Sequence, residues 1–173
     1  MARDLFIIRD AAVADLSDIA QMAEIYAHHV RHGTASFELE PPSPAALADR
    51  LYKCCEAGLP VLVIISPKKH IAGYAYLSAF HHRAAFNHTV EDSIYIDHNL
   101  TGQGLGKMLL TALIERARDA GKRQIMAVIG DSDNQASIGL HRAMGFVPIG
   151  IARDIGFKFG RFLDVVYMQR DLR

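Results

Sequence analysis

Three glycines at alternate positions, Gly102, Gly104 and Gly106, form a loop that could bind a phosphate group. The loop follows an apolar segment typical of a strand and directly precedes a segment with the apolar spacing of a helix. This order places free backbone N–H groups at the positive end of a helix dipole, where phosphate or pyrophosphate binds favourably. Lys107, in the first helical turn, could add a positive charge. The alternative is a simple tight turn, but the flanking strand and helix favour a phosphate loop.

A single carboxylate in the preceding apolar segment is the second candidate for chemistry. The alternation of a strand over residues 90–96 places Glu91, Ser93 and Tyr95 on one face and Asp92 on the other. Glu91 could also be a structural carboxylate that faces solvent or pairs with an arginine. Beside a phosphate loop, however, an isolated carboxylate favours an enzyme that acts on a phosphate-bearing cofactor.

The segments that must position these residues follow from apolar periodicity. Strands are predicted over 5–9, 61–65, 71–77, 90–96, 124–129, 146–151 and 162–168. Helices are predicted over 17–31, 44–57 and 105–120, with a short one between 134 and 145. Ser43 and Pro44 provide the cap and the first turn of the second helix. The third should bury one stripe of apolar residues: Leu105, Met108, Leu109, Ala112, Leu113, Ala117 and Ala120. A loop rich in Gly, Lys and Arg should separate the last two strands. The order β-α-α-β-β-β-α-β-α-β-β predicts an α/β (α+β) domain, a mixed central sheet with helices on both faces.

Composition limits the class of protein. A chain of 173 residues with half of them hydrophobic fits a single domain over 1–173. Lys+Arg and Asp+Glu are equal at 19 each, so nothing favours binding to nucleic acid or to an anionic membrane. Cys54 and Cys55 are adjacent and cannot easily form an unstrained disulfide. Free thiols, a charged N-terminus and no long apolar run together predict a cytoplasmic protein.

Several motifs, in order along the chain, indicate a family. They are Thr34-Ala35-Ser36-Phe37, Thr89-Val90-Glu91-Asp92-Ser93-Ile94-Tyr95, the glycine loop, Asn134-Gln135-Ala136-Ser137-Ile138-Gly139-Leu140-His141, Gly145-Phe146 and Gly156-Phe157-Lys158-Phe159-Gly160. From Ile8 to Met168 the chain resembles the GNAT superfamily of acetyl-CoA-dependent N-acetyltransferases, and within it the phosphinothricin N-acetyltransferase group. Thr101 departs from the Arg or Gln usual at that position, which implies a modest loss of side-chain contact and no change of cofactor.

The resemblance implies a single GNAT domain with acetyl-CoA as co-substrate. Its pyrophosphate would lie on the glycine loop, and its pantetheine arm along the strand and the short helix. The implied cofactor-binding residues are Ile94, Tyr95, Ile96, Gly102, Gln103, Gly104, Leu105, Gly106, Lys107, Asn134 and Ser137. Asn134 could equally be just the N-cap of its helix, and both roles are compatible.

The resemblance also implies catalytic roles for two residues. An alkyl-ammonium must lose a proton before it can attack a thioester, and Glu91, directly or through one water, would remove it. One N–H of the strand would stabilise the oxyanion. His141 occupies the position where many GNAT enzymes have a tyrosine, and it could protonate the departing thiolate. The alternative for His141 is a half-buried helix histidine bonded to the backbone.

The segment before this strand is where the family carries substrate contacts. His81, His82 and Arg83 lie there, and Arg83 could form a forked pair with a substrate carboxylate. A solvated polar loop is the alternative. Phe37 and Lys158 are weaker candidates for the same pocket.

Three histidines at positions 28, 29 and 32 suggest a metal site only superficially. No Cys, Asp or Glu completes a ligand set at suitable spacing, so a solvated helix end is expected and no metal.

The predicted activity is direct acetyl transfer, in a ternary complex, to the amino group of a small amino-acid-like substrate such as phosphinothricin or methionine sulfoximine or sulfone. One alternative is an N-acetyltransferase for another amine, either a polyamine or a protein N-terminus. A second is a non-catalytic acetyl-CoA-binding module, against which Glu91 argues. By resemblance alone, a homodimer is expected.

Overall fold

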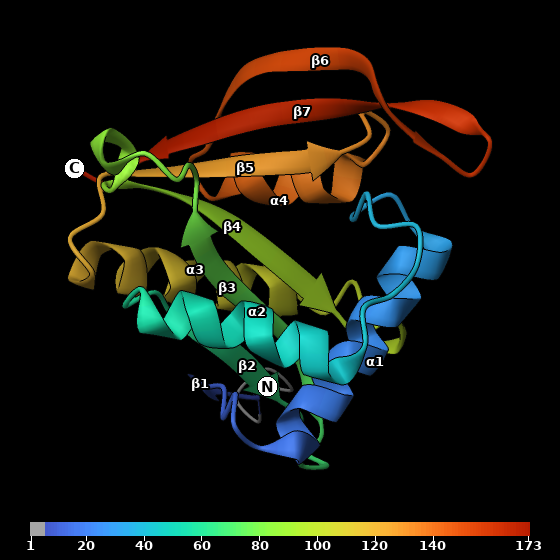
Figure 1. Cartoon of the computed structure of the whole chain (residues 1–173), viewed down its shortest axis with the longest axis vertical. Helices are drawn as coiled ribbons and strands as arrows, with labels where there is room; N and C mark the ends of the chain where they lie inside the picture. Colours follow the sequence, from blue (N-terminus) through green and yellow to red (C-terminus); the bar gives the residue numbers. More distant parts are fainter. Residues whose placement is uncertain (1–5) are drawn as a thin grey trace.

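One seven-stranded sheet organises the chain in the computed structural model, which describes residues 6–173. Its strand order is β1-β2-β3-β4-β5-β7-β6 (Figure 1). The strands are β1 (Ile7–Asp10), β2 (Val61–Ile65), β3 (Ile71–Ala79), β4 (Thr89–Ile96), β5 (Gln124–Gly130), β6 (Val147–Lys158) and β7 (Arg161–Asp171). All neighbours pair antiparallel except β4 and β5, which are parallel. The predicted mixed sheet is therefore confirmed.

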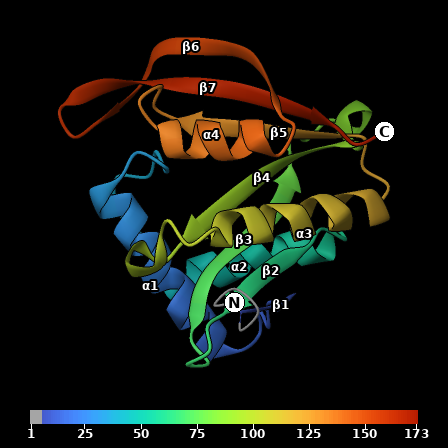
Figure 2. The same ribbon diagram turned by 180° about the vertical axis from the view of Figure 1, so that it is seen from behind.

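Four α-helices cover the sheet: α1 (Leu16–His32), α2 (Pro44–Glu56), α3 (Leu105–Asp119) and α4 (Gln135–Ala143). Figures 1 and 2 show α1 and α2 on one face and α3 and α4 on the other. Short 3-10 turns occupy Ala84–Phe86 and His98–Leu100. The helices begin where the sequence predicts: the Ser43 side chain caps α2 ahead of Pro44, and Asn134 caps α4. The element order and the two-faced arrangement agree with the prediction.

The central feature of the sheet is the separation of β4 from β5. These strands pair only from Thr89 to Glu91, opposite Gln124 to Met126. Beyond this point β4 and β5 no longer pair with each other, and the two views show them diverging. The separation opens the sheet from Ser93 onward, beside the N-terminus of α3.

Two predictions about the elements were wrong in detail. The expected loop after residue 151 is instead the second half of β6, which continues to Lys158 through an irregularity between Ala152 and Gly156. The buried face of α3 includes Leu110 and Ile114 and excludes Ala120, because the helix packs against both β3 and β4. Part of the first predicted strand, residue 5, lies outside the described residues.

Within residues 6–173 no helix has both the length and the apolarity needed to cross a membrane.

Candidate active site

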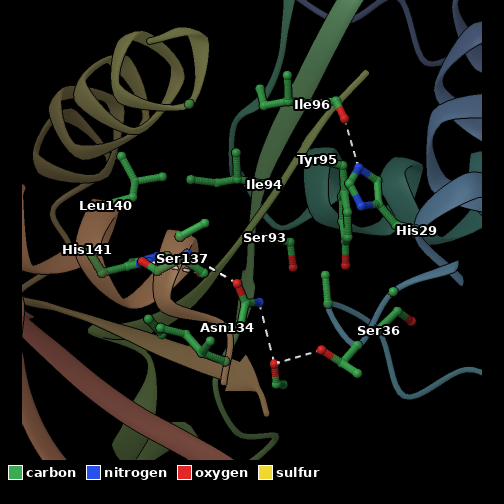
Figure 3. Close-up of a pocket in the computed structure, with 18 of the residues that line it drawn as sticks. His29, Ser36, Ser93, Ile94, Tyr95, Ile96, Asn134, Ser137, Leu140 and His141 are labelled. Atoms are coloured by element: carbon green, nitrogen blue, oxygen red, sulfur yellow. Dashed lines mark hydrogen bonds between the residues drawn. The ribbon is translucent and has the colours of Figure 1, made fainter. Parts of the chain in front are cut away.

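A cleft of about 930 Å³ lies where β4 and β5 separate. Its walls come from the loop after α1, the exposed part of β4, the glycine loop, the end of β5 and the start of α4 (Figure 3). Gly102 and Gly104 have φ angles of 76° and 82°, a left-handed conformation that only glycine adopts readily. Gly104 is the N-cap of α3 and turns the chain into the helix. The first N–H groups of α3, which have no acceptor within the helix, therefore lie at the cleft.

Most residues of the predicted phosphate loop line this cleft. They are Gly102, Gly104, Leu105, Gly106 and Lys107. Gln103 is exposed and is not part of the lining, so only its backbone remains a candidate. The Thr101 hydroxyl donates a hydrogen bond to the His98 carbonyl (3.3 Å), which uses this side chain to close the preceding turn.

Alternation along β4 divides its side chains between the two faces of the sheet. The Tyr95 ring lies 4.8 Å from the ring of Tyr26 in α1, so the face of Glu91 and Ser93 is the one that α1 covers. The Asp92 carboxylate is bonded to His141 of α4, so its face is the one that α3 and α4 cover. The two neighbouring carboxylates consequently point into different environments.

Glu91 has the properties of a general base. Its pKa is raised to about 6, first by burial and second by the negative charge of Asp92. No positively charged group among residues 6–173 contributes to this shift, so the structure gives no support to the alternative of an arginine-paired carboxylate. Glu91 lines the cleft at the last β4–β5 pair, where the strands begin to separate. A carboxylate of this pKa can accept a proton from an ammonium near neutral pH.

His141 is buried and both of its ring nitrogens are engaged. Nδ1 lies 2.8 Å from the Ser137 carbonyl oxygen, and Nε2 lies 3.0 Å from Asp92 Oδ2. Burial alone would lower the pKa of His141, but the hydrogen bond and the charge of Asp92 outweigh burial and raise it. The alternative of a helix histidine bonded to the backbone is therefore met by the Ser137 carbonyl. The bond to the Asp92 carboxylate was not predicted. Because His141 also lines the cleft, its role as proton donor stays a prediction.

Comparisons with known proteins agree with this arrangement. A sequence model of the Acetyltransferase (GNAT) family matches residues 22–146, which is more than half of the chain. The chain belongs to the GNAT acetyltransferase family. It is 48% identical to the phosphinothricin N-acetyltransferase of Alcaligenes faecalis over 90% of this chain and 78% of that protein. It is also 41% identical to the L-methionine sulfoximine/L-methionine sulfone acetyltransferase of Pseudomonas aeruginosa, over 95% and 94% of the two chains.

A solved GNAT structure is similar in fold over nearly the whole chain. The crystal structure of a phosphinothricin acetyltransferase from Sinorhizobium meliloti, in complex with AcCoA, superposes with a TM-score of 0.90 and 42% identity. The match covers 96% of this chain and 88% of that one. The predicted GNAT fold and family resemblance are thereby confirmed.

Asn134 and Ser137 both line the cleft of this GNAT domain. The Asn134 side-chain oxygen Oδ1 accepts a hydrogen bond from the Ser137 N–H (3.2 Å), which is the helix cap that the sequence suggested (Figure 3). Ile94, Tyr95 and Ile96 line the cleft from β4. These positions are compatible with contacts to a pantetheine arm, which remain predictions.

The loop after α1 forms the wall of the cleft on the Glu91 side. Phe37 lies in this wall, packed against glycines of two strands. A Cβ on Gly156 would lie 2.2 Å from a Phe37 ring atom, and a Cβ on Gly130 would lie 3.2 Å from another. Glycine is thus required at Gly156 for the ring to sit where it does. Phe37 therefore lines the cleft, and its contact with an acceptor stays a prediction.

Lys158 lies elsewhere than the sequence predicted. It is 3% exposed and does not line the cleft. Its ammonium group donates to the carbonyl oxygens of Gly33 (3.0 Å) and Ser36 (2.6 Å), and burial lowers its pKa. With its charge directed at two carbonyls, Lys158 secures the loop that carries Phe37 and makes no direct contact with the cleft.

The predicted acceptor residues His81, His82 and Arg83 are not part of the cleft lining. His82 and Arg83 are exposed, and the Arg83 N–H donates to His81 Nδ1 (3.1 Å). They precede the 3-10 turn Ala84–Phe86, which lies in space beside the C-terminal end of the chain and away from α1 (Figure 1). Within one chain the structure does not bring them to Glu91, and their role stays a prediction.

The cleft lining also includes residues that sequence reasoning did not assign to the site, among them Tyr76, Asp92 and Arg161. Tyr76 pairs across from Ser93 in β3, and the hairpin prediction could have indicated this neighbour. The Arg161 guanidinium forms an ion pair with Asp131 (2.5 Å) and keeps about half of its side chain exposed. No local pattern in the sequence distinguishes it.

The histidines at the end of α1 are explained without a metal. His28 stacks on His98 with ring centroids 3.7 Å apart, and His29 Nε2 lies 2.8 Å from the Ile96 carbonyl oxygen. Among residues 6–173, no group of three or more His, Cys, Asp or Glu side chains is arranged to hold a metal ion.

Proposed function

We propose that this GNAT protein transfers the acetyl group of acetyl-CoA directly, in a ternary complex, to the amino group of a small amino-acid-like acceptor. Phosphinothricin and methionine sulfoximine or sulfone are the acceptors favoured, since they appear in the names of the relatives. The observation that carries the proposal is Glu91, a cleft carboxylate with a pKa of about 6 and no positively charged partner.

The cleft fits acetyl-CoA on two structural grounds. Left-handed glycines at 102 and 104 present the unpaired N–H groups of α3, which suit a pyrophosphate. Beyond Glu91, β4 has no β5 partner, so its backbone can bind an amide-containing arm such as pantetheine. Lys107, exposed beside the loop, supplies a positive charge.

Transfer then requires three groups of this chain. Glu91 accepts a proton from the acceptor ammonium, and the neutral amine attacks the thioester carbon. An N–H within Ile94–Ile96 stabilises the oxyanion. The C–N bond forms first and gives a tetrahedral intermediate. Its nitrogen loses a second proton, the C–S bond breaks, and His141 supplies the proton to the thiolate.

The charge around the acceptor side supports an anionic acceptor. Arg161 lines the cleft with an exposed guanidinium, although Asp131 pairs with it. Arg83 is the alternative cation, from a loop outside the cleft of the same chain. Arg161→Gln and Arg83→Gln distinguish the two candidates. Only the variant that has lost the arginine bound to the acceptor carboxylate should show a raised KM for the acceptor.

A homodimer is part of the proposal. The hairpin of β6 and β7 exposes large apolar side chains that a monomer would leave in water: Val147, Ile149, Ile151, Ile155, Phe157, Phe159 and Phe162. An apolar surface of this kind favours association with a second copy. Sedimentation velocity tests it, with Phe157→Asp as the variant expected to yield monomers.

A cytoplasmic location is proposed on the cysteines. Cys54 and Cys55 are both free thiols, as expected in a reducing compartment.

Thiol release from acetyl-CoA tests the activity. The acceptor panel is phosphinothricin, methionine sulfoximine, methionine sulfone, the standard amino acids, spermidine and a short peptide. Saturable release with the first three acceptors supports the proposal. Preference for spermidine or the peptide would reassign the acceptor class, and binding of acetyl-CoA without turnover would leave a non-catalytic module.

A further inference from the structure

A buried ion pair joins the two walls of the cleft on the α3–α4 side of the sheet. Asp92 extends from β4 and His141 from α4, with Oδ2 and Nε2 3.0 Å apart. Their side chains are only 2% and 6% exposed. The groups that face His141 are Asp92, the carbonyl and the hydroxyl of Ser137 in its own helix, and the Phe146 ring. The Ser137 hydroxyl lies 3.3 Å from Nδ1, farther than the carbonyl oxygen at 2.8 Å, and the Phe146 ring centroid lies 4.9 Å from that of His141.

Hydrogen-bond geometry fixes how many protons the pair holds. The Ser137 carbonyl oxygen can only accept, so His141 Nδ1 carries a proton. A carboxylate oxygen and an unprotonated nitrogen would repel each other, so the 3.0 Å contact between Oδ2 and Nε2 requires a second proton between them. The pair thus holds one proton more than a neutral imidazole and an ionised carboxylate would hold.

We propose that Asp92 is the positioning residue that keeps this second proton on His141 and holds the ring at the cleft, so that the pair supplies the proton to the departing thiolate. The inference rests on the proposed acetyl transfer and deepens it. Asp92 was not among the residues that the motifs assigned to the site.

Two observations favour this role over a purely structural tie between β4 and α4. Buried ion pairs contribute little net stability compared with apolar side chains of the same volume, so stability alone does not explain the pair. Asp92 Oδ1 is also buried and has no hydrogen-bond partner among residues 6–173. An unpartnered carboxylate oxygen is uncommon in a protein interior, and this one belongs to a residue of the cleft wall, which favours a role for Asp92 at the site over a purely structural one.

The proton balance of the step is simple. As the C–S bond breaks, the sulfur takes the electron pair, and the Nε2 proton then leaves its hydrogen bond to Asp92 for the sulfur. His141 is left neutral, with its remaining proton on Nδ1 and donated to the Ser137 carbonyl oxygen. The acceptor ammonium loses its first proton to Glu91, on the opposite face of β4, and its nitrogen loses a second proton as the tetrahedral intermediate becomes the amide. One proton returns to His141 and one is released to solvent, so each turnover restores the enzyme.

The test combines a spectroscopic and a kinetic readout. Nitrogen-15 NMR of the histidine rings reports protonation directly, and His141→Gln identifies the His141 signals. In the wild type, both His141 nitrogens should be protonated at pH 7. In Asp92→Asn the ring should become the neutral Nδ1–H tautomer, because the amide can donate to Nε2.

Kinetics use the acceptor that the wild type turns over fastest. Asp92→Asn should lower kcat by roughly 10- to 100-fold, at most the worth of a general acid. KM for acetyl-CoA should change little, and the alkaline limb of the kcat profile should move to lower pH. Asp18→Asn is the control, since it breaks the ion pair of a buried aspartate (side-chain exposure 7%) with the half-exposed Arg9. Neither residue lines the cleft, so kcat and its pH profile should stay unchanged.

The outcomes are separable. Neutral His141 in the wild type at pH 7 would overturn the proposal, and this measurement does not depend on how Asp92→Asn folds. If His141 is charged in the wild type but Asp92→Asn keeps the wild-type kcat, the pair is structural. That result would overturn this proposal and leave the proposed acetyl transfer unaffected. A wild type that turns over no acceptor would overturn the proposed function and, with it, the role of the pair.

Discussion

Glu91 and Asp92, neighbours in the chain, direct their carboxylates to opposite faces of β4. Glu91 shares its face with Tyr95, which packs on α1, whereas Asp92 is bonded to His141 of α4. In the proposed mechanism, one strand thereby presents a base to the acceptor side and a proton-holding pair to the thioester side. The two are also coupled, because the charge of Asp92 contributes to the raised pKa of Glu91.

Replacing Glu91 by Gln should abolish most of the activity. The amide cannot accept the ammonium proton, and general base catalysis is worth about 10²–10⁴-fold in rate. In the wild type, kcat/KM should fall as the pH drops below about 6, where Glu91 becomes protonated. Steady-state kinetics from pH 5 to 9 measure both effects. Turnover preserved in the variant would remove Glu91 from the mechanism.

The same variant should be more stable than the wild type at neutral pH. Glu91 has a folded-state pKa of about 6, above its ordinary 4.5, so the folded protein binds this proton more tightly than the unfolded chain. The stability that this provides is present below pH 4.5 and is lost as the pH rises through about 6. Ionised Glu91 therefore costs up to about 2 kcal/mol at pH 7.5.

Thermal unfolding at two pH values measures this difference. Glu91→Gln should raise Tm by about 2–6 °C at pH 7.5 and by much less at pH 4.5. Glu24→Gln, on the exposed side of α1, is the control for a surface substitution. An equal Tm for Glu91→Gln and the wild type at pH 7.5 would contradict the burial cost.

Gly104→Ala should weaken acetyl-CoA binding. An alanine at φ 82° costs about 1–2 kcal/mol, and relief of that strain would displace the loop that presents the α3 amides. Gly58→Ala is a matched control, since Gly58 has φ 70° at the end of α2 and no neighbouring atom within 4 Å of the added Cβ. Calorimetric titration should show a raised Kd for acetyl-CoA in the first variant alone, with a lowered Tm in both. Equal Kd values would mean that loop geometry does not control binding.

Local signals predicted most of the fold. Caps at Ser43 and Asn134, alternation in β4 and the glycine loop are each encoded within a few residues, and all appear as predicted. The second half of β6 was missed because Arg153 and Asp154 suggest a loop, and Asp154 has a positive φ of 53° at the irregularity. The partner strand β7 restores the pairing from Gly156 onward.

The site was less predictable because its contacts join distant segments. Asp92 and His141 are 49 positions apart, and neither residue alone indicates the other. The Lys158 ammonium was expected in a polar pocket, but carbonyls more than 120 positions away satisfy it in the interior. The sequence does predict that Glu91 lies at the site, since a carboxylate in an apolar strand is a local signal, and Glu91 lines the cleft.

Lys158→Met should loosen the acceptor wall without affecting the thioester side. The substitution removes two hydrogen bonds to the loop that carries Phe37 and leaves the carbonyls of Gly33 and Ser36 without their donor, at a cost of about 1–3 kcal/mol each where they stay buried. KM for the acceptor should therefore rise severalfold, while Kd for acetyl-CoA stays near the wild-type value. Lys53→Met, which breaks an exposed pair with Asp49 on α2, is the control and should change neither. A Lys158 variant with an unchanged acceptor KM and a lowered Tm would restrict this residue to stability, because a loop that forms the acceptor wall cannot loosen without altering acceptor binding.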